Sequence, residues 1–220
     1  MNDDNFYTGL SMDYKNIEQG TDAWKAIRLG KVTASRVKDI LAKTKTGVSA
    51  SRANYLSDLV VERRTGMPAN DFKNEYMQWG TETEPKAREA YELATGELVT
   101  EIAFVDHPEI PMAGASPDGL VGTDGLIEIK CPSTKTHIET LMDDKVPNQY
   151  IPQMQWQMAC TGRKWCDFVS FDPRLPDGEQ FFCKRVYRND EYINTLESEV
   201  QRFLNEVNEA MTKLDQRTKK

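Results

Sequence analysis

Two acidic residues and a lysine between residues 116 and 130 could act together in chemistry. The stretch runs from Pro117-Asp118 through Thr123-Asp124-Gly125 to Glu128-Ile129-Lys130. An Asp-Gly between alternating residues predicts a β-hairpin, and a turn centred near Thr123 places Asp118 almost opposite Glu128. Lys130 follows Glu128 by two residues and therefore shares its face of the strand. Two facing carboxylates destabilise a sheet unless a cation lies between them, so the stretch predicts a metal site with a lysine beside it.

The chemistry that such a site supports is hydrolysis of a phosphodiester. Carboxylates bind Mg²⁺ through hard oxygen atoms. The main chain of Ile129 lies between the side chains of Glu128 and Lys130 on the same strand, so its carbonyl could complete the coordination. A bound Mg²⁺ acidifies a water and neutralises charge on a phosphate. Lys130 is suited to orienting that water or to stabilising the growing charge.

The composition fits one soluble globular domain over residues 1–220, with 39% hydrophobic and 29% charged residues. We expect residues 1–16 to be a loosely ordered lead-in. The sequence contains no apolar run long enough to cross a membrane and no signal-peptide pattern, so we expect a cytoplasmic protein.

Four cysteines without a CxxC pair and only two histidines make a structural zinc site an unfavoured interpretation. His107 and His137 have no partners at ligand or nucleophile spacing, and we treat both as incidental. Cys131 follows the lysine directly, but no histidine is placed to activate it, so we expect it to fill a small buried space.

The charge is unevenly distributed. The chain carries a formal charge of −7, yet residues 24–73 contain eleven basic and four acidic residues, a net +7. A basic segment beside an acidic remainder is compatible with one face that binds a polyanion. The alternative is an ordinary solvated surface of mixed charge.

The hydrophobic periodicity predicts an α/β fold, a central mixed sheet of about five strands flanked by helices. We expect helices at about 22–28, 35–43, 52–64, 82–95, 134–142, 148–161 and 190–214, and strands at 98–105, 112–118, 125–131, 165–171 and 180–188. Thr21 or Asp22 is expected to cap the first helix, and Thr33 or Ser35 the second. Residues 43–51 are predicted to be a polar, mobile loop.

The last predicted helix has one apolar stripe, formed by Ile193, Leu196, Val200, Phe203, Val207, Ala210 and Leu214. Such a stripe more often covers a sheet than packs against a partner helix.

The motifs together resemble the lambda-exonuclease-like (YqaJ-type) viral recombinase family of the PD-(D/E)xK nuclease superfamily. Pro117-Asp118 and Glu128-Ile129-Lys130, with nine residues between the acids, resemble the PD-(D/E)xK signature. Further matching segments come in the family order: Gln19–Trp24, Arg28–Gly30, Thr33–Ser35, Trp79-Gly80 with Glu84, Ser116–Gly119, Glu128–Pro132, Tyr150–Gln153 and Phe171–Arg174. The resemblance covers about residues 17–174 and is weak over 43–75. It implies a restriction-endonuclease-like core.

The resemblance implies that Asp118 and Glu128 hold Mg²⁺ and that Lys130 assists the attacking water. The Ile129 carbonyl would complete the coordination of what we expect to be two Mg²⁺ ions, which Mn²⁺ could replace. Glu84 would add a carboxylate from its helix. A capping box, Thr81-x-x-Glu84, is the structural alternative. Because Pro85 lacks an N–H, we expect the helix to begin nearer Thr83, with Glu84 at its mouth facing the metals.

Arg28 and Ser35 match the family's pocket for a terminal 5′-phosphate. A helix N-terminus, a hydroxyl and an arginine are each suited to bind phosphate. An ordinary N-cap and a surface cation are the alternative for these two residues.

Three further residues have expected roles at the substrate. Tyr150 and Gln153 can face the same way from a helix whose start is fixed by Pro152, and the resemblance makes them substrate- or water-positioning groups. A buried tyrosine and a surface glutamine are the alternative. Met77 could wedge an opened base step, although a methionine is most often core filler.

The expected function is a Mg²⁺-dependent 5′-to-3′ exonuclease of double-stranded DNA. It would release 5′-mononucleotides and leave a 3′-overhang for a recombinase. The resemblance further implies a ring-shaped homotrimer and a single-strand annealing protein as partner, in the cytoplasm of a bacterial host. The rival interpretations are a structure-specific or restriction-type endonuclease of the same superfamily, and a non-catalytic DNA-binding recombination protein.

Overall fold

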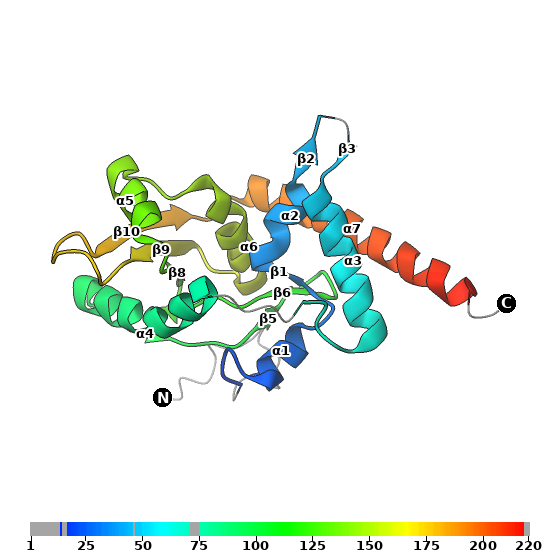
Figure 1. Ribbon diagram of the computed structural model, residues 1–220, viewed down its shortest axis with the longest axis horizontal. Helices are drawn as coiled ribbons and strands as arrows, with labels where there is room; N and C mark the ends of the chain where they lie inside the picture. Colours follow the sequence, from blue (N-terminus) through cyan, green and yellow to red (C-terminus); the bar gives the residue numbers. More distant parts are fainter. Residues whose placement is uncertain (1–13, 15–16, 46, 71–74, 218–220) are drawn as a thin grey trace.

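A five-stranded mixed sheet forms the centre of the computed structural model, which describes residue 14 and residues 17–45, 47–70 and 75–217 (Figure 1). Its strands, in spatial order, are β10 (Phe181–Tyr187), β9 (Trp165–Phe171), β8 (Gly125–Lys130), β7 (Gly119–Val121) and β4 (Val99–Thr100). β8 and β9 are parallel, and the other neighbours are antiparallel. The predicted fold class is confirmed. Apart from Tyr14, the predicted lead-in 1–16 lies outside the residues that the structure describes.

The hairpin of β7 and β8 has the register that the sequence predicts. Gly119 pairs with Ile127 and Val121 with Gly125, so the turn is centred on Thr123. The next pair outward in this register joins Asp118 to Glu128. Because side chains alternate along a strand, Lys130 shares the face of Glu128.

Two predicted strands differ from the structure. The segment 98–105 divides between β4 and β5 (Val105–Asp106), whereas 112–118 contains only β6 (Ala113–Ala115), and β7 begins after it at Gly119. β5 and β6 belong to a separate three-stranded sheet of order β1-β6-β5, in which β1 (Val32–Thr33) runs parallel to β6. Pro117 lies between β6 and β7, where its missing N–H cannot contribute to a ladder.

The N-terminal helices agree with the prediction only in part. α1 (Asp22–Arg28) is capped by Thr21, whose side chain accepts a hydrogen bond from the Trp24 N–H. The predicted helix 35–43 is instead a 3₁₀ turn, η2 (Ala34–Arg36), followed by the short α2 (Val37–Leu41). Neither Thr33 nor Ser35 caps α2 with its side chain, because Thr33 ends β1 and Ser35 lies inside the turn.

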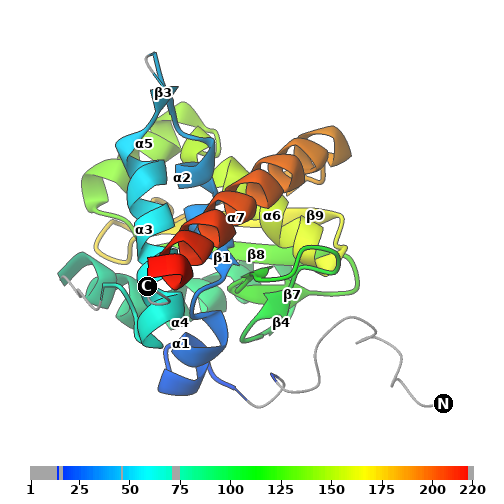
Figure 2. The ribbon, with the colours of Figure 1, turned by 90° about the vertical axis from the view of Figure 1, so that its right-hand side faces the viewer.

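The predicted polar loop 43–51 contains a short hairpin of β2 (Lys43–Thr44) and β3 (Gly47–Val48). The hairpin projects away from the rest of the protein (Figures 1 and 2). Ser49 then caps α3 (Ala50–Thr65), and Gly66 ends that helix in the left-handed conformation.

Helix α4 (Glu75–Thr95) begins well before the predicted start near Thr83 and contains Pro85 in its interior. Proline removes one helical hydrogen bond, but Ala87 and Tyr91 are fully buried against the sheet and keep the helix in place. Thr81 donates its hydroxyl to the Met77 carbonyl rather than capping the helix. Both the capping box and the helix mouth are therefore wrong for Glu84, which lies in the middle of α4.

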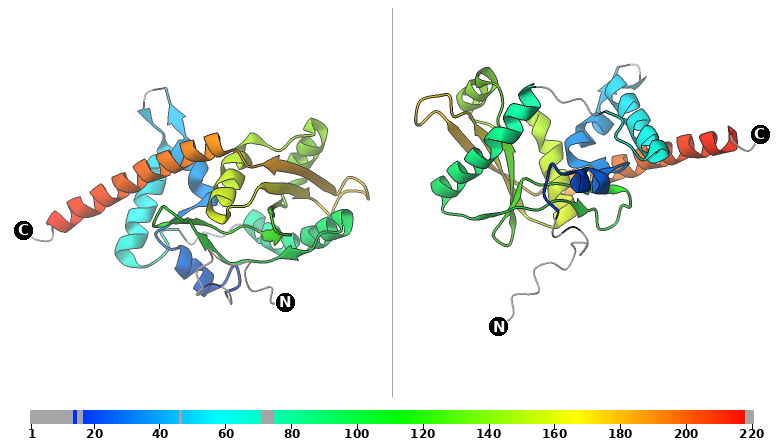
Figure 3. Two further views of the ribbon diagram at one scale, coloured as in Figure 1. Left: turned by 180° about the vertical axis from the view of Figure 1, so that it is seen from behind. Right: turned by 60° about the horizontal axis from the view of Figure 1, so that its bottom comes forward.

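Helices α4 and α6 (Ile151–Thr161) cover opposite faces of the central sheet (Figures 2 and 3). Ile127 and Ile129 pack toward α4, whereas Leu126 packs toward α6. The 3₁₀ turn η3 (Asn148–Tyr150) precedes α6, and α5 (Thr134–Asp143) precedes both. Because residues alternate along β8, Glu128 and Lys130 face α6.

Helix α7 (Asp190–Arg217) packs mainly against other helices, contrary to the prediction that its stripe covers a sheet. Leu196, Val200, Phe203 and Val207 share a core cluster with α2, α3 and α6, and Ile193 reaches the cluster of the central sheet. The far end of α7 extends from the body of the protein (Figure 1). Among the described residues, no helix is both long and apolar enough to cross a membrane.

Candidate functional site

The end of the β7–β8 hairpin brings two carboxylates together. Asp118 Oδ2 accepts a hydrogen bond of 2.7 Å from the Ile129 N–H, which ties Asp118 to the strand that bears Glu128. Glu128 has no exposed surface. Burial, followed by the charges of Glu128 and Glu84, raises the pKa of Asp118 well above its usual range. A cation placed beside these groups would oppose that shift, because it favours the ionised carboxylate.

Three donors hold Glu128. Gln153 Nε2 donates to Oε1 and Gln157 Nε2 to Oε2, each at 2.6 Å, and the Lys130 ammonium forms an ion pair with Oε1. Gln153 was predicted from the sequence, and Gln157 was missed. Gln157 follows Gln153 by four residues, and residues four apart on a helix lie on the same face. This spacing was the sequence signal that could have identified it.

Lys130 and Tyr150 lie beside each other. The Lys130 Nζ is 5.4 Å from the centre of the Tyr150 ring, and Tyr150 stacks on Phe168 at 5.3 Å. The pKa of Lys130 is raised, because attraction to Glu128 and Asp118 outweighs the effect of burial. Lys130 therefore stays protonated at neutral pH.

Glu84 approaches the hairpin from the other side of the sheet. Its carboxylate accepts a hydrogen bond of 2.9 Å from Arg88, which also binds Glu101 at 2.7 Å. Burial raises the pKa of Glu84; Arg88 opposes this, and Glu128 adds to it. Glu84 is thus within electrostatic range of the hairpin, but its nearest partner is an arginine.

The oxygen atoms at this site fit Mg²⁺. The Ile129 carbonyl is a third oxygen ligand candidate beside the Asp118 and Glu128 carboxylates. It points to the same side of β8 as the Ile129 N–H that binds Asp118. Within the described ranges, no three His, Cys, Asp or Glu side chains converge into a complete metal cluster. Mg²⁺ commonly uses one or two carboxylates together with water and substrate phosphate, so two carboxylates are sufficient.

Arg28 contacts the residue that lies two positions before Asp118 in the chain. Its Nη1 donates to the Ser116 hydroxyl at 2.7 Å, and its guanidinium stacks over Trp24 at 4.0 Å. Trp24 Nε1 also donates to Ser116. Ser116 was not predicted as a site residue, although it directly precedes Pro117-Asp118. Ser35, the predicted partner of Arg28, is exposed on η2.

Arg28 differs from most basic residues of its segment. Lys31, Arg36 and Arg52 form ion pairs with Asp106, Asp39 and Glu206, respectively. In the part of the chain that the structure describes, Arg28 forms no such pair. Burial lowers the pKa of Arg28 to about 10, an effect that Tyr55, Glu62 and Asp118 oppose, so the group stays charged at neutral pH. An unpaired, partly buried guanidinium is suited to bind an anion.

The remaining candidates lie outside this group. Met77 is 55% exposed near the start of α4. His137 is buried and hydrogen-bonded to Ser170 and to the Glu179 carbonyl. His107 Nδ1 accepts the backbone N–H groups of Glu109 and Ile110. Burial raises the pKa of Cys131 to about 12, with Glu84 and Asp118 contributing, so its thiol is protonated and a poor nucleophile.

A sequence model of the YqaJ-like viral recombinase domain matches residues 23–164. This match spans more than half of the chain and includes both carboxylates, Lys130 and both glutamines. The chain belongs to the YqaJ-like viral recombinase domain family.

Two solved structures of LHK-Exo, an alkaline exonuclease from Laribacter hongkongensis, are similar to this member of the family. Each is 54% identical and aligns over 90% of this chain and 98% of LHK-Exo, with TM-scores of 0.84 and, for the complex with dAMP, 0.85. A phage-related exonuclease from Haemophilus somnus 129PT has the same fold at 16% identity, with a TM-score of 0.65 over 84% of this chain and 96% of that one. The comparison with curated proteins gave no match.

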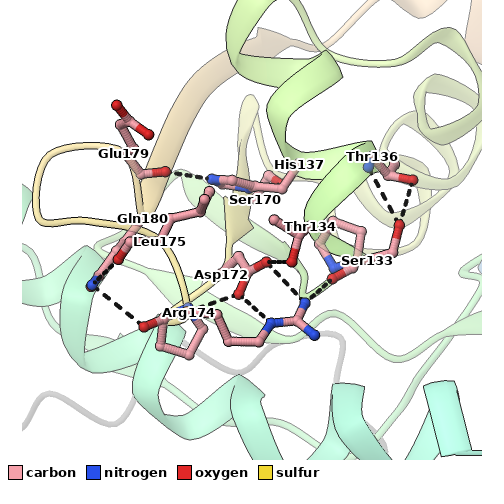
Figure 4. Close-up of polar contacts among 12 residues, drawn as sticks. Ser133, Thr134, Thr136, His137, Ser170, Asp172, Arg174, Leu175, Glu179 and Gln180 are labelled. Carbon is pink, nitrogen blue, oxygen red and sulfur yellow. Dashed lines mark hydrogen bonds and ion pairs between the residues drawn. The ribbon is translucent and has the colours of Figure 1, made fainter.

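In this YqaJ-like domain a buried aspartate ties the loop after β9 to the start of α5 (Figure 4). Asp172 has no exposed surface and accepts hydrogen bonds from the Arg174 guanidinium at 2.7 and 2.8 Å and from the Thr134 hydroxyl at 2.7 Å. Arg174 also stacks over Trp79 of α4 at 4.2 Å. Burial alone would raise the pKa of Asp172, but the hydrogen bonds from Arg174 and Thr134 lower it to about 2.

The substitution Asp172→Asn is expected to destabilise the protein by about 2 kcal/mol at pH 6 and by about half as much at pH 3. The folded-state pKa lies below the unfolded-state value, so the charged form stabilises the fold above pH 4 and loses that effect as the pH falls toward 2. Urea unfolding of both proteins from pH 6 to pH 3 measures the difference. Asp177→Asn, at an exposed neighbour, is the control and should change stability by less than about 0.5 kcal/mol. A difference that does not vary with pH would contradict the role of this carboxylate.

Proposed function

We propose that this chain is a Mg²⁺-dependent 5′-to-3′ exodeoxyribonuclease that digests one strand of double-stranded DNA from a 5′-phosphorylated end. It would release 5′-mononucleotides and leave a 3′-overhang for recombination. Membership of the YqaJ-like family and 54% identity to an alkaline exonuclease support the exonuclease activity. The cation is inferred from the carboxylate pair, and the polarity and the product are inferred from the resemblance to the lambda-exonuclease-like family together with Arg28.

The observation that carries the proposal is the adjacency of two different sites. The carboxylate pair with Lys130 is suited to cleave a phosphodiester, and Arg28 is suited to bind a terminal phosphate. Arg28 reaches Ser116, which lies only two residues before Asp118. An internal cut would not require a second phosphate site at this distance, whereas an enzyme that starts at a strand end would.

The Asp118 and Glu128 carboxylates and the Ile129 carbonyl would hold Mg²⁺. Bound there, the ion would lower the pKa of a water and offset charge on the scissile phosphate. Lys130 keeps its proton and would stabilise the negative charge that develops as water attacks phosphorus. The new bond joins the water oxygen to phosphorus, and the bond from phosphorus to O3′ breaks in line. The departing 3′-oxygen takes up a proton, and no covalent enzyme intermediate forms.

Gln153 and Tyr150 border the same carboxylate and would position water or substrate. Gln153 is only half-buried, so its amide can exchange Glu128 for a ligand. Met77 is exposed near the start of α4 and would separate the first base pair.

A digestion time course on three substrates tests the function. In Mg²⁺ we expect rapid release of mononucleotides from linear 5′-phosphorylated duplex, slower release from linear 5′-hydroxyl duplex, and none from closed circular duplex. Asp118→Asn and Lys130→Ala are each expected to lower the rate by about a thousandfold or more, because each removes charge from the reaction centre. Thermal unfolding of both variants serves as the control for folding.

The outcomes separate the rival functions. Fast loss of the circle would identify an endonuclease. DNA binding without any release of nucleotides would identify a non-catalytic protein. Full activity in both variants would show that the reaction centre lies elsewhere.

Substitution of Arg28 tests the terminal-phosphate site separately. Arg28→Met is expected to lower kcat/KM on 5′-phosphorylated ends by about ten- to a hundredfold, because a charge-assisted hydrogen bond to phosphate is lost. Activity on 5′-hydroxyl ends should change little. Lys25→Met, on the same helix at a residue that pairs with Asp22, is the matched control. An equal loss on both kinds of end would contradict end recognition by Arg28.

We further propose a ring-shaped homotrimer that works with a single-strand annealing recombinase. Leu93 and Leu98 are 87% and 79% exposed, and apolar surface of this kind is suited to subunit contact. Light scattering is expected to give a mass of about 75 kDa, three times the 25.1 kDa chain. A monomer that retains processive digestion would contradict the ring.

A further inference from the structure

Gln157 is a buried amide in an apolar part of the protein. It has no exposed surface, and its neighbours on α6, Trp156 and Met158, are fully buried as well. Burying an amide is costly unless its polar atoms are hydrogen-bonded. The amide nitrogen of Gln157 donates to Glu128 Oε2 at 2.6 Å, and its oxygen faces the Cys166 thiol at 3.9 Å.

The orientation of this amide is fixed by the chemistry of its partner. An ionised carboxylate only accepts hydrogen bonds, so Gln157 must present its NH₂ group to Glu128. The two oxygen atoms of Glu128 are then used differently. Lys130 and Gln153 share Oε1 at the half-buried edge, whereas Gln157 holds Oε2 from the interior.

We propose that Gln157 is a positioning residue that sets the plane of the Glu128 carboxylate for cation binding. Lys130 and Gln153 can move when a cation or substrate reaches Oε1. Gln157, enclosed in the core, keeps Oε2 in place, so that the Glu128 carboxylate remains correctly rotated. The proposal rests on the proposed function, because it requires Glu128 to bind a cation.

A second buried glutamine on the same helix shows what a purely structural role looks like. Gln155 is 3% exposed, and its amide bridges the Tyr187 carbonyl at 2.8 Å and the Asn189 N–H at 2.9 Å. These contacts tie α6 to the end of β10 and do not involve the carboxylate pair. Gln155 is therefore a matched control of the same residue type, helix and burial.

The experiment compares Gln157→Met with Gln155→Met in the full chain. Two properties are measured during a Mg²⁺ titration: the shift in melting temperature and the Mg²⁺ concentration that gives half-maximal digestion of 5′-phosphorylated duplex. Loss of a hydrogen-bond partner of a metal ligand commonly lowers metal affinity by ten- to a hundredfold. We therefore expect Gln157→Met to require at least about tenfold more Mg²⁺ in both measurements. Gln155→Met should lower the melting temperature without Mg²⁺ and leave the Mg²⁺ requirement unchanged.

Gln157→Asn provides a second variant in case methionine beside the buried carboxylate prevents folding. It retains an amide but is one methylene too short to reach Oε2, so it should raise the Mg²⁺ requirement in the same direction. The proposal is overturned if folded Gln157 variants respond to Mg²⁺ within twofold of the wild type, or if Gln155→Met shifts the requirement equally. A wild-type protein that shows neither a Mg²⁺-dependent melting shift nor Mg²⁺-dependent digestion would instead refute the proposed function.

Discussion

Repulsion between two carboxylates in a poorly solvated hairpin is the constraint on which the rest of the site depends. Asp118 and Glu128 face each other because the register of β7 and β8 leaves no other arrangement. The surrounding residues supply hydrogen-bond donors: the Ile129 N–H, two glutamine amides from α6 and the ammonium of Lys130. With little water to screen charge, a divalent cation would be attracted strongly to this position. A cation bound there would offset the repulsion between the two carboxylates.

The alternation of β8 explains which elements can reach the site. Glu128 and Lys130 face α6, and the intervening Ile127 and Ile129 pack against α4. A side chain of α4 such as Glu84 can therefore approach only around the end of the strand. This position explains why Glu84 affects the pKa of Asp118 yet takes Arg88 as its nearest partner. The carboxylate pair therefore lies on the α6 side of the sheet, at the strand end that Glu84 approaches from α4.

The sequence predicts most reliably what is determined locally. Turn residues and alternation fix the hairpin, and Thr21 identifies the start of α1. The predicted start of α4 was wrong. Pro85 favours a helix that begins nearby, but the burial of Ala87 and Tyr91 outweighs the one hydrogen bond that the proline removes from a longer helix. The contact of Arg28 with Ser116 spans 88 residues, and no local pattern indicates it. Gln157 was missed because a polar residue inside an apolar helix is informative only once its partner is known.

The distribution of ion pairs changes the meaning of the basic segment. Counted along the chain, residues 24–73 carry +7, which suggests a broad surface for DNA. In the structure, acids from the same segment and from distant ones pair with many of these cations, including Lys31, Arg36 and Arg52. A chain of net charge −7 has little diffuse attraction to a polyanion. The proposed recognition of a strand end would then depend on directional contacts, and Arg28, stacked on Trp24 and held by Ser116, is oriented to provide one next to the carboxylate pair.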